Sequence, residues 1–150
     1  MKKLKKATLM LVALTLTIFF LSACATVTPE EKRFRGIMQP PADKSVIYFY
    51  RTFSLFFAGG AAIYENGKKI VPATSPRTYS KYYIEPGTHT FEAKALLGLH
   101  KKVPVTIVNE KPGKVYYIQM ITRPAYIELR EMDPEQAKLE LQKCFELKVD

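Results

Sequence analysis

The sequence contains no tryptophan, two cysteines and two histidines in its 150 residues. Cysteine and histidine supply most protein ligands of zinc, and neither a Cys-x-x-Cys nor a His-Glu-x-x-His spacing occurs. The Gly-x-Ser-x-Gly motif of serine hydrolases and the phosphate loop of nucleotide-binding proteins are also absent. We therefore expect no catalytic residues, no metal site and no cofactor.

Acidic residues are few: 14 stand against 23 lysines and arginines, which gives a net charge of +9. A strongly basic chain invites a nucleic-acid interpretation. However, Lys2, Lys3, Lys5 and Lys6 supply four of these charges, and the chain from Cys24 onward carries 19 basic and 14 acidic residues. Because much of the excess lies at the amino terminus, we expect no nucleic-acid partner.

An uncharged apolar segment follows these lysines, at residues 7–21. It is shorter than the roughly 20 residues that a membrane-spanning helix needs, and its length is typical of an export signal. The next residues, Leu21-Ser22-Ala23-Cys24, resemble the lipobox of bacterial lipoproteins, Leu-[Ala/Ser]-[Gly/Ala]-Cys. The resemblance implies that residues 1–23 are a signal peptide and that Cys24 becomes the lipidated first residue.

The same resemblance implies a location. A diacylglyceryl group and a fatty acid such as palmitate on Cys24 would anchor the chain to the bacterial cell envelope. Ala25 stands where an aspartate would retain a lipoprotein in the inner membrane, which implies the outer membrane, facing the periplasm. The membrane is thus the first expected partner, and an envelope protein or anionic polymer is the second.

Residues 24–44 are expected to form a lipidated tether. Pro29, Pro40 and Pro41 interrupt the segment, and it shows neither helical nor strand periodicity. About 20 residues reach at most roughly 70 Å when fully extended. The folded domain is therefore expected to begin at residue 45.

Residues 45–150 are expected to be mainly β, as an antiparallel β-sandwich of about seven to eight short strands with one C-terminal helix. Apolar and aromatic residues occupy both faces of Ser45–Arg51, which predicts a strand buried on both sides. Turn signals separate the others at the spacing of a sandwich. The further expected strands lie within Ala61–Pro72, Thr78–Ile84, Thr88–Ala95, Lys101–Asn109, Lys114–Thr122 and Ala125–Glu131.

Two of the turns have specific signatures. Asn66-Gly67 predicts a type I′ hairpin, with Glu65 opposite Lys68 and Ile63 opposite Ile70. Pro86-Gly87 predicts a type II turn, because proline fixes φ at its second position and glycine accepts a positive φ at its third. Pro112-Gly113 repeats this device.

The C-terminal residues change to helical spacing. Asp133 and Pro134 predict an N-cap and a first helical residue, and Ala137, Leu141 and Cys144 recur on one face of a helix of about 12 residues. If Cys24 carries lipid, Cys144 has no partner for an intramolecular disulfide. We expect Cys144 to be buried on this helix.

The order of these motifs resembles an uncharacterised domain-of-unknown-function family of small bacterial lipoproteins. The likeness covers roughly residues 45–132. It implies a fold and a cellular address but no reaction. The motifs are Ile47-Tyr48-Phe49-Tyr50-Arg51, the Ile63–Ile70 hairpin with Asn66-Gly67, Pro86-Gly87-Thr88-His89 and Gly113-Lys114-Val115-Tyr116-Tyr117-Ile118.

Four residues are candidates for binding. Arg51 ends an apolar strand and suits a carboxylate or phosphate, while His89 follows a turn. Phe56 and Phe57 belong to residues 52–62, an uncharged segment that predicts buried core, an exposed loop that touches lipid, or a partner-binding patch.

These observations predict a membrane-anchored, non-enzymatic binding or structural module of the cell envelope. One alternative is an envelope enzyme or enzyme inhibitor, which requires Arg51, His89 and a carboxylate in one pocket. Another is a lipoprotein that binds lipid or another hydrophobic ligand through residues 52–62.

Overall fold

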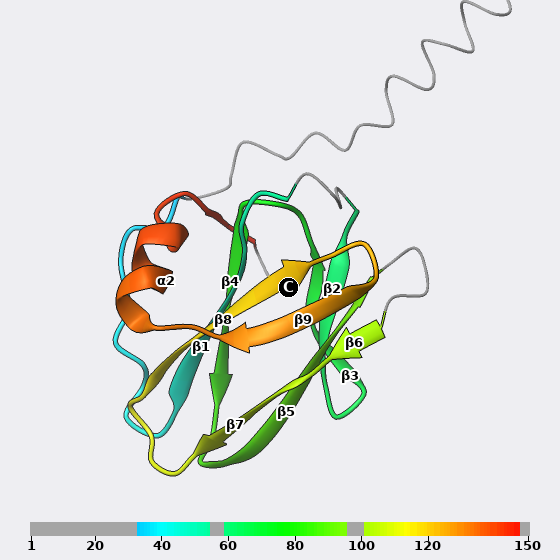
Figure 1. Ribbon diagram of the computed structural model, residues 1–150. Helices are drawn as coiled ribbons and strands as arrows, with labels where there is room; N and C mark the ends of the chain where they lie inside the picture. Colours follow the sequence, from blue (N-terminus) through cyan, green and yellow to red (C-terminus); the bar gives the residue numbers. More distant parts are fainter. Residues whose placement is uncertain (1–32, 55–58, 96–100, 148–150) are drawn as a thin grey trace, which may run out of the picture. The chain divides into compact units, whose positions relative to one another are not determined.

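The computed structural model describes residues 33–54, 59–95 and 101–147 (Figure 1). Within these ranges the chain forms ten strands and one helix, α2 (Pro134–Leu141). The strands are β1 (Ser45–Arg51), β2 (Ala61–Glu65), β3 (Lys68–Thr74), β4 (Thr78–Ile84), β5 (Gly87–Ala95), β6 (Lys101–Val103), β7 (Val105–Asn109), β8 (Val115–Thr122), β9 (Tyr126–Glu131) and β10 (Phe145–Glu146).

The strands form two sheets that enclose a common apolar core, so the expected β-sandwich with a C-terminal helix is confirmed. One sheet has the order β10-β4-β1-β8-β9-β6 and the other the order β3-β2-β5-β7. Two short strands, β6 and β10, raise the number above the seven to eight expected. The larger sheet is mixed rather than antiparallel, because β1–β8, β10–β4 and β6–β9 are parallel pairs.

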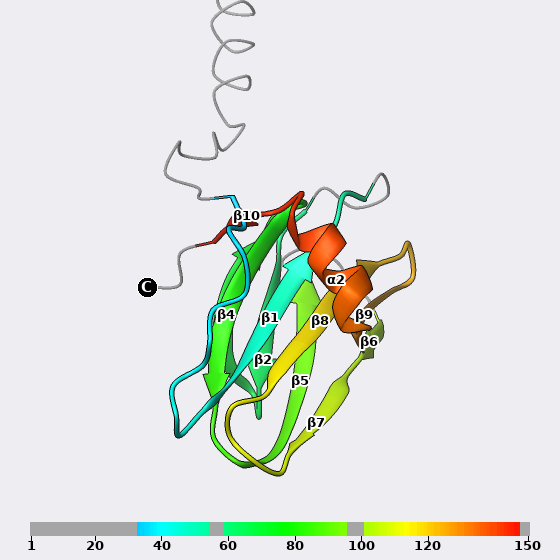
Figure 2. The same cartoon turned by 90° about the vertical axis from the view of Figure 1, so that its left-hand side faces the viewer.

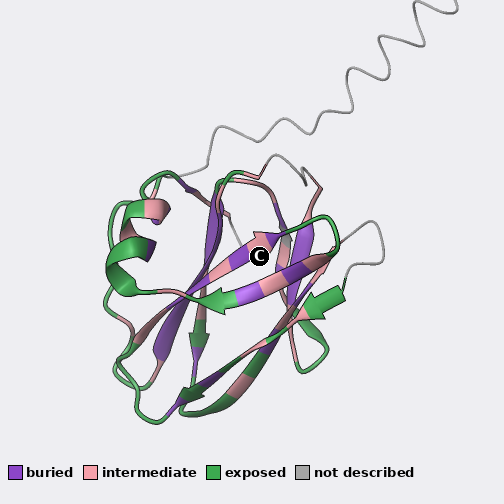
Figure 3. Cartoon of the chain, viewed as in Figure 1, coloured by how far each residue is buried: buried purple, intermediate pink, exposed green. Residues whose placement is uncertain are grey.

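Strand β1 is the buried centre of the larger sheet, between β4 and β8. All seven of its residues are buried, as their two-sided apolar pattern predicts (Figure 3). Ile47 and Phe49 point into the core between the sheets, and Tyr48 and Tyr50 belong to a second apolar cluster on the opposite face. Helix α2 covers that face, where it lies across β1 and β8 (Figure 2).

The hairpin between β2 and β3 has the predicted turn. Asn66 and Gly67 have φ values of 48° and 80°, as a type I′ turn requires, and Glu65 lies opposite Lys68. The prediction for Ile63 is wrong, because it lies opposite Val71 rather than Ile70. An irregularity between Ile63 and Tyr64 shifts the register by one residue.

The two Pro-Gly turns are corners between the sheets. Pro86-Gly87 joins β4 of the larger sheet to β5 of the smaller one, and Pro112-Gly113 joins β7 to β8. Gly87 has a φ of 148°, outside the range of a type II turn, so this prediction is wrong. The expected strand over residues 101–109 is divided at Pro104 into β6 and β7, which belong to different sheets. Proline has no N–H to continue a ladder.

Helix α2 begins as predicted and ends early. Oδ1 of Asp133 accepts hydrogen bonds from the backbone N–H groups of Glu135 and Gln136, at 2.9 and 3.2 Å, and Pro134 is the first helical residue. The helix has eight residues instead of about 12. Cys144 is buried as expected, but it lies after the helix and immediately before β10.

Part of the expected tether packs on the sandwich. The ring of Phe34 makes edge contacts with Tyr48 and Tyr79, at centroid distances of 5.8 and 5.5 Å. Tyr48 also accepts a hydrogen bond of 2.9 Å from the backbone N–H of Met38. The folded unit therefore begins before residue 45, while residues 24–32 lie outside the described ranges.

The described residues contain no helix of the length and apolar composition that crossing a membrane requires. The predicted signal segment, residues 7–21, falls outside the ranges that the structure describes.

Candidate functional site: a basic groove at one end of the sandwich

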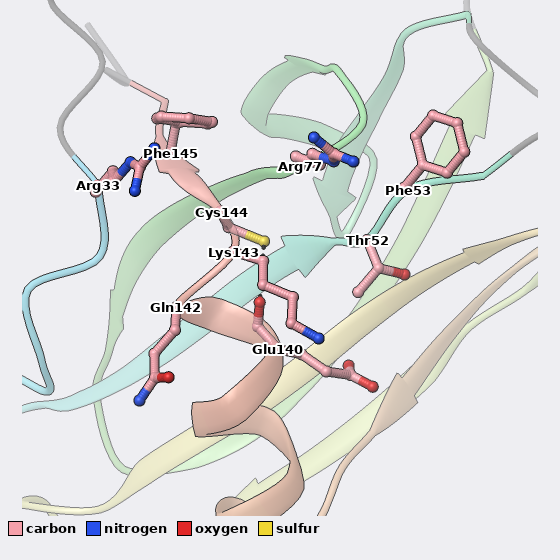
Figure 4. A pocket seen from close by; sticks show the side chains of 9 residues that line it. All are labelled: Arg33, Thr52, Phe53, Arg77, Glu140, Gln142, Lys143, Cys144 and Phe145. Carbon is pink, nitrogen blue, oxygen red and sulfur yellow. Dashed lines mark hydrogen bonds between the residues drawn. The ribbon is translucent and has the colours of Figure 1, made fainter.

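One concavity among the described residues is an open groove of about 610 Å³, which we call the basic groove (Figure 4). It lies where β1 ends, where β4 begins and where α2 connects to β10. Its lining residues are Arg33, Thr52, Phe53, Arg77, Glu140, Gln142, Lys143, Cys144 and Phe145.

Two arginines of the groove lie over aromatic rings. The guanidinium carbon of Arg77 is 5.3 Å from the centre of the Phe53 ring, and that of Arg33 is 5.7 Å from the centre of the Phe145 ring. Figure 4 shows these pairs on opposite sides of the groove, with Lys143 and Cys144 between them. Such pairs orient a cation without neutralising it.

The three cations of the groove have no acidic partner among the described residues. No described carboxylate lies within 4.0 Å of the charged nitrogens of Arg33, Arg77 or Lys143. All three residues are exposed. The groove therefore presents an excess of positive charge to solvent.

Glu140 is the one acidic residue of the lining, and other groups bind it. Its Oε2 accepts hydrogen bonds from the Tyr50 hydroxyl at 2.9 Å and from Nε2 of Gln119 at 3.0 Å. Its Oε1 accepts one from Nε2 of Gln136 at 3.3 Å. These three donors connect the carboxylate to β1, β8 and α2, which suits a structural role.

Cys144 lies in the wall of the groove as an inert thiol. It is 1% exposed, and its Sγ lies 3.8 Å from the carbonyl oxygen of Arg51 and 3.6 Å from that of Glu140. Burial, together with the charge of Glu140, raises the pKa of the thiol to about 11. The thiol is therefore protonated at neutral pH, and a protonated thiol is a poor nucleophile.

Arg51 is not accessible to a ligand. Its side chain is among the most buried in the protein, at 1% exposure, and its Nη1 donates hydrogen bonds to the carbonyl oxygens of Gly59 at 2.7 Å and Thr74 at 3.1 Å. Desolvation lowers the pKa of the guanidinium. Arg51 thus links the end of β1 to the connection before β2 and to β3, and its burial argues against the binding role expected for it.

His89 belongs to a polar network at the other end of the sandwich. Its Nδ1 lies 2.5 Å from Oε1 of Glu65, and its Nε2 lies 2.9 Å from the carbonyl oxygen of Glu85. The Tyr82 hydroxyl donates a 2.8 Å hydrogen bond to Oε2 of Glu65. Because Tyr82 is in β4 and the other two side chains are in β5 and β2, this network connects the two sheets.

The structure does not bring Arg51 and His89 together. Asn109 donates a hydrogen bond to the same Glu85 carbonyl and accepts one from Ser45, so His89 lies near the first residue of β1. Arg51 is the last residue of that strand, about 20 Å away at roughly 3.3 Å per residue. The shared pocket that the enzyme alternative requires is therefore not formed by these two residues.

The three remaining predicted residues, Cys24, Phe56 and Phe57, lie outside the described ranges. The described part of the segment over residues 52–62 is divided. Phe53 is 59% exposed, whereas Ala61 and Ala62 are buried in β2. The exposed and the core interpretations therefore apply to different residues of this segment.

Sequence reasoning did not identify the cations of the basic groove. Arg33, Arg77 and Lys143 are far apart in the chain and belong to no recognisable motif. Among the other lining residues, Thr52 and Phe53 belong to the uncharged segment over residues 52–62, and Cys144 was expected to be buried. The positive φ of Arg77, 61°, becomes apparent only in the folded chain.

Within the described ranges, no group of three or more histidine, cysteine, aspartate or glutamate side chains is arranged to hold a metal ion. No protein-family model matches the chain, and no curated protein matches it either. The functional proposals therefore depend on the chain's own residues.

Proposed function

We propose that this protein is a bacterial lipoprotein of the cell envelope, anchored through Cys24, and that its β-sandwich binds another envelope component without catalysing a reaction. The observation that carries the proposal is the sequence of the first 24 residues. Lysines, an uncharged apolar segment and Leu21-Ser22-Ala23-Cys24 follow one another in the order that export and lipidation require.

The anchor is physically sufficient for stable attachment. Each buried methylene group contributes about 0.8 kcal/mol, so one acyl chain binds a bilayer only marginally and two or three hold it firmly. A lipidated Cys24 would keep the sandwich at the membrane without a spanning helix. By the lipobox resemblance and the identity of Ala25, we propose the outer membrane with the domain facing the periplasm.

The non-enzymatic part of the proposal is supported by the state of the reactive residue types. Cys144 is buried with a raised pKa, Arg51 is buried among carbonyl groups, and His89 is engaged with Glu65. These side chains have structural contacts. The exposed, charged surface of the basic groove suits recognition of an anionic partner.

Mass spectrometry of the mature amino terminus tests the anchor. The full chain, produced in a bacterium that processes lipoproteins, should begin at Cys24 and carry the mass of a diacylglyceryl group. The variant Cys24→Ser should lose both the lipid and cleavage at this site. Cys144→Ala is the matched control, since it removes the other cysteine and should leave the lipid in place. An unmodified Cys24 in the mature protein would refute the proposal.

Crosslinking of the membrane-bound protein in its native envelope tests the binding role. A binding module should yield a specific crosslinked partner, protein or polymer. If charge contributes to binding, the crosslinking yield should fall at high salt. Turnover of an envelope substrate by the purified protein would instead favour the enzyme alternative.

A further inference from the structure

We propose that the basic groove and Phe53 form a membrane-contact face that binds the phosphate headgroups of anionic phospholipids in the bilayer that holds the lipid anchor. The inference deepens the proposed function and rests on its anchor at Cys24. It names one occupant of the groove, the anionic bilayer surface.

The lining of the basic groove carries an excess of positive charge. Arg33, Arg77 and Lys143 line the groove, and none of them has a described carboxylate within ion-pair distance. Glu140 opposes them with one negative charge, which three hydrogen-bond donors already bind. Arginine recognises phosphate through two parallel N–H donors. The groove therefore offers donors that a phosphate would satisfy.

An exposed aromatic residue, Phe53, lies beside these cations. Phe53 is 59% exposed, although it is apolar and follows a fully buried strand. It lines both the basic groove and a neighbouring groove that contains Arg123. An aromatic ring flanked by cations is suited to the boundary between headgroups and acyl chains, where the ring leaves water and the cations stay hydrated.

Arg33, the first described residue, is part of the groove lining. Arg33 lies nine residues after Cys24, so the lipid anchor is at most about 30 Å from the groove when the chain between them is extended. Arg33 pairs with Phe145, beside the start of β4. The described chain therefore begins at the groove end of the sandwich, and the Ser45 end of β1 lies about 20 Å further along that strand.

The opposite end of the sandwich lacks this excess charge. The turns and flanking residues at the Ser45 end combine four acidic residues with four lysines, so their charges balance. These residues are Asp43, Glu65, Glu85 and Glu110, and Lys44, Lys68, Lys111 and Lys114. The charge difference between the ends favours one orientation on an anionic surface.

Because the chain contains no tryptophan, a single substitution supplies a specific probe. The experiment uses the full lipidated chain with Phe53→Trp, inserted into vesicles of phosphatidylcholine with or without phosphatidylglycerol. Phospholipids with brominated acyl chains quench an indole only at short range. Tyr83→Trp is the matched control, because Tyr83 is 39% exposed and pairs with Val46 at the opposite end.

We expect strong quenching of the Phe53→Trp variant in vesicles that contain phosphatidylglycerol, and much less quenching of the Tyr83→Trp variant. Removing one cation near an anionic membrane surface lowers the affinity for that surface about fivefold. Arg77→Asn and Lys143→Gln, each added to Phe53→Trp, should therefore reduce the quenching and its sensitivity to phosphatidylglycerol. Asparagine tolerates the positive φ of Arg77, and Lys143 is exposed, so at least the second variant should keep its fold.

Two outcomes would overturn the inference. One is the absence of quenching in a Phe53→Trp protein whose lipidation is verified by mass; the other is equal quenching of the Phe53→Trp and Tyr83→Trp variants. A third result would refute the membrane-contact proposal and indicate a protein partner instead. In that result the unsubstituted groove retains an acidic envelope protein, Arg77→Asn and Lys143→Gln lose it, and the lipid response is absent.

The anchor and the groove can fail separately. If Cys24 carries no lipid, the proposed function fails, and sedimentation of the unlipidated chain with the same vesicles then tests the groove alone. Binding to phosphatidylglycerol vesicles that Lys143→Gln weakens about fivefold would support the inference even so, and equal binding by parent and variant would overturn it.

Discussion

The hydroxyl of Tyr50 donates a 2.9 Å hydrogen bond to Oε2 of Glu140, 90 residues later in the chain. Tyr50 is 1% exposed and lies in the buried central strand, while Glu140 lies near the end of α2. Burial and the nearby carboxylate both raise the pKa of Tyr50. This contact holds the last turn of α2 against β1. The residues that follow this turn line the basic groove.

Tyr50→Phe should therefore lower the free energy of unfolding by about 1.5–3 kcal/mol, because a hydrogen bond to a charged group is lost inside the protein. Urea unfolding followed by circular dichroism measures the change. Tyr83→Phe, at a 39% exposed position, is the control and should change stability by less than about 0.5 kcal/mol. Equal effects of the two substitutions would contradict the role given to Tyr50.

Cys144 should resist alkylation in the folded protein. Its pKa of about 11, against an ordinary 9.0, leaves roughly one hundredth of the usual thiolate at pH 8, and burial hinders the reagent further. Iodoacetamide labelling followed by mass spectrometry should be slow in buffer and fast in guanidinium chloride. Rapid labelling of the native protein would show an accessible, reactive thiol instead.

Stability should fall at alkaline pH. Six described tyrosines have a raised pKa, and burial with the Glu65 hydrogen bond raises the pKa of Tyr82 to about 12. The unfolded chain loses these protons near the ordinary value of 10.0 while the folded chain retains them. The stabilisation is therefore complete below about pH 10 and is lost as the pH rises toward 12.

Urea midpoints at about pH 8, 10 and 11 test this expectation. The midpoint should change little up to about pH 9 and fall above about pH 10. Tyr82→Phe should cost about 1 kcal/mol at pH 8 and show a shallower alkaline decline, because it removes one of the titrating groups. If the urea midpoint of this variant fell with pH as steeply as that of the parent, Tyr82 would not contribute to the alkaline loss of stability.

Phe34 should contribute to the stability of the sandwich although it precedes the first strand. Its ring packs against Tyr48 and Tyr79, so Phe34→Ala should lower the free energy of unfolding by about 2–3 kcal/mol. Ile37→Ala, three residues later and 40% exposed, should have less than about 0.5 kcal/mol of effect. A neutral Phe34→Ala would mean that this segment is a tether after all.

Local sequence signals predicted the features that depend on adjacent residues. The two-sided apolar pattern of β1, the Asn66-Gly67 turn and the Asp133-Pro134 helix start all follow from backbone geometry and side chains within a few positions. The number and approximate position of most strands follow in the same way. The register opposite Ile63 was predicted wrongly because an irregularity between Ile63 and Tyr64 lies within the hairpin, and the turn residues do not specify it.

The amino acid sequence by itself thus determined the β-rich composition, the turn chemistry and the export and lipidation signals that we propose. Only the tertiary structure decided which strands share a sheet, since β1 pairs in parallel with β8 across a long stretch of chain. It also decided that Arg51 is buried, that His89 lies at the far end and that Arg33, Arg77 and Lys143 meet around one groove. The physical reason is that burial and electrostatic proximity depend on contacts between distant segments, which local propensity does not specify.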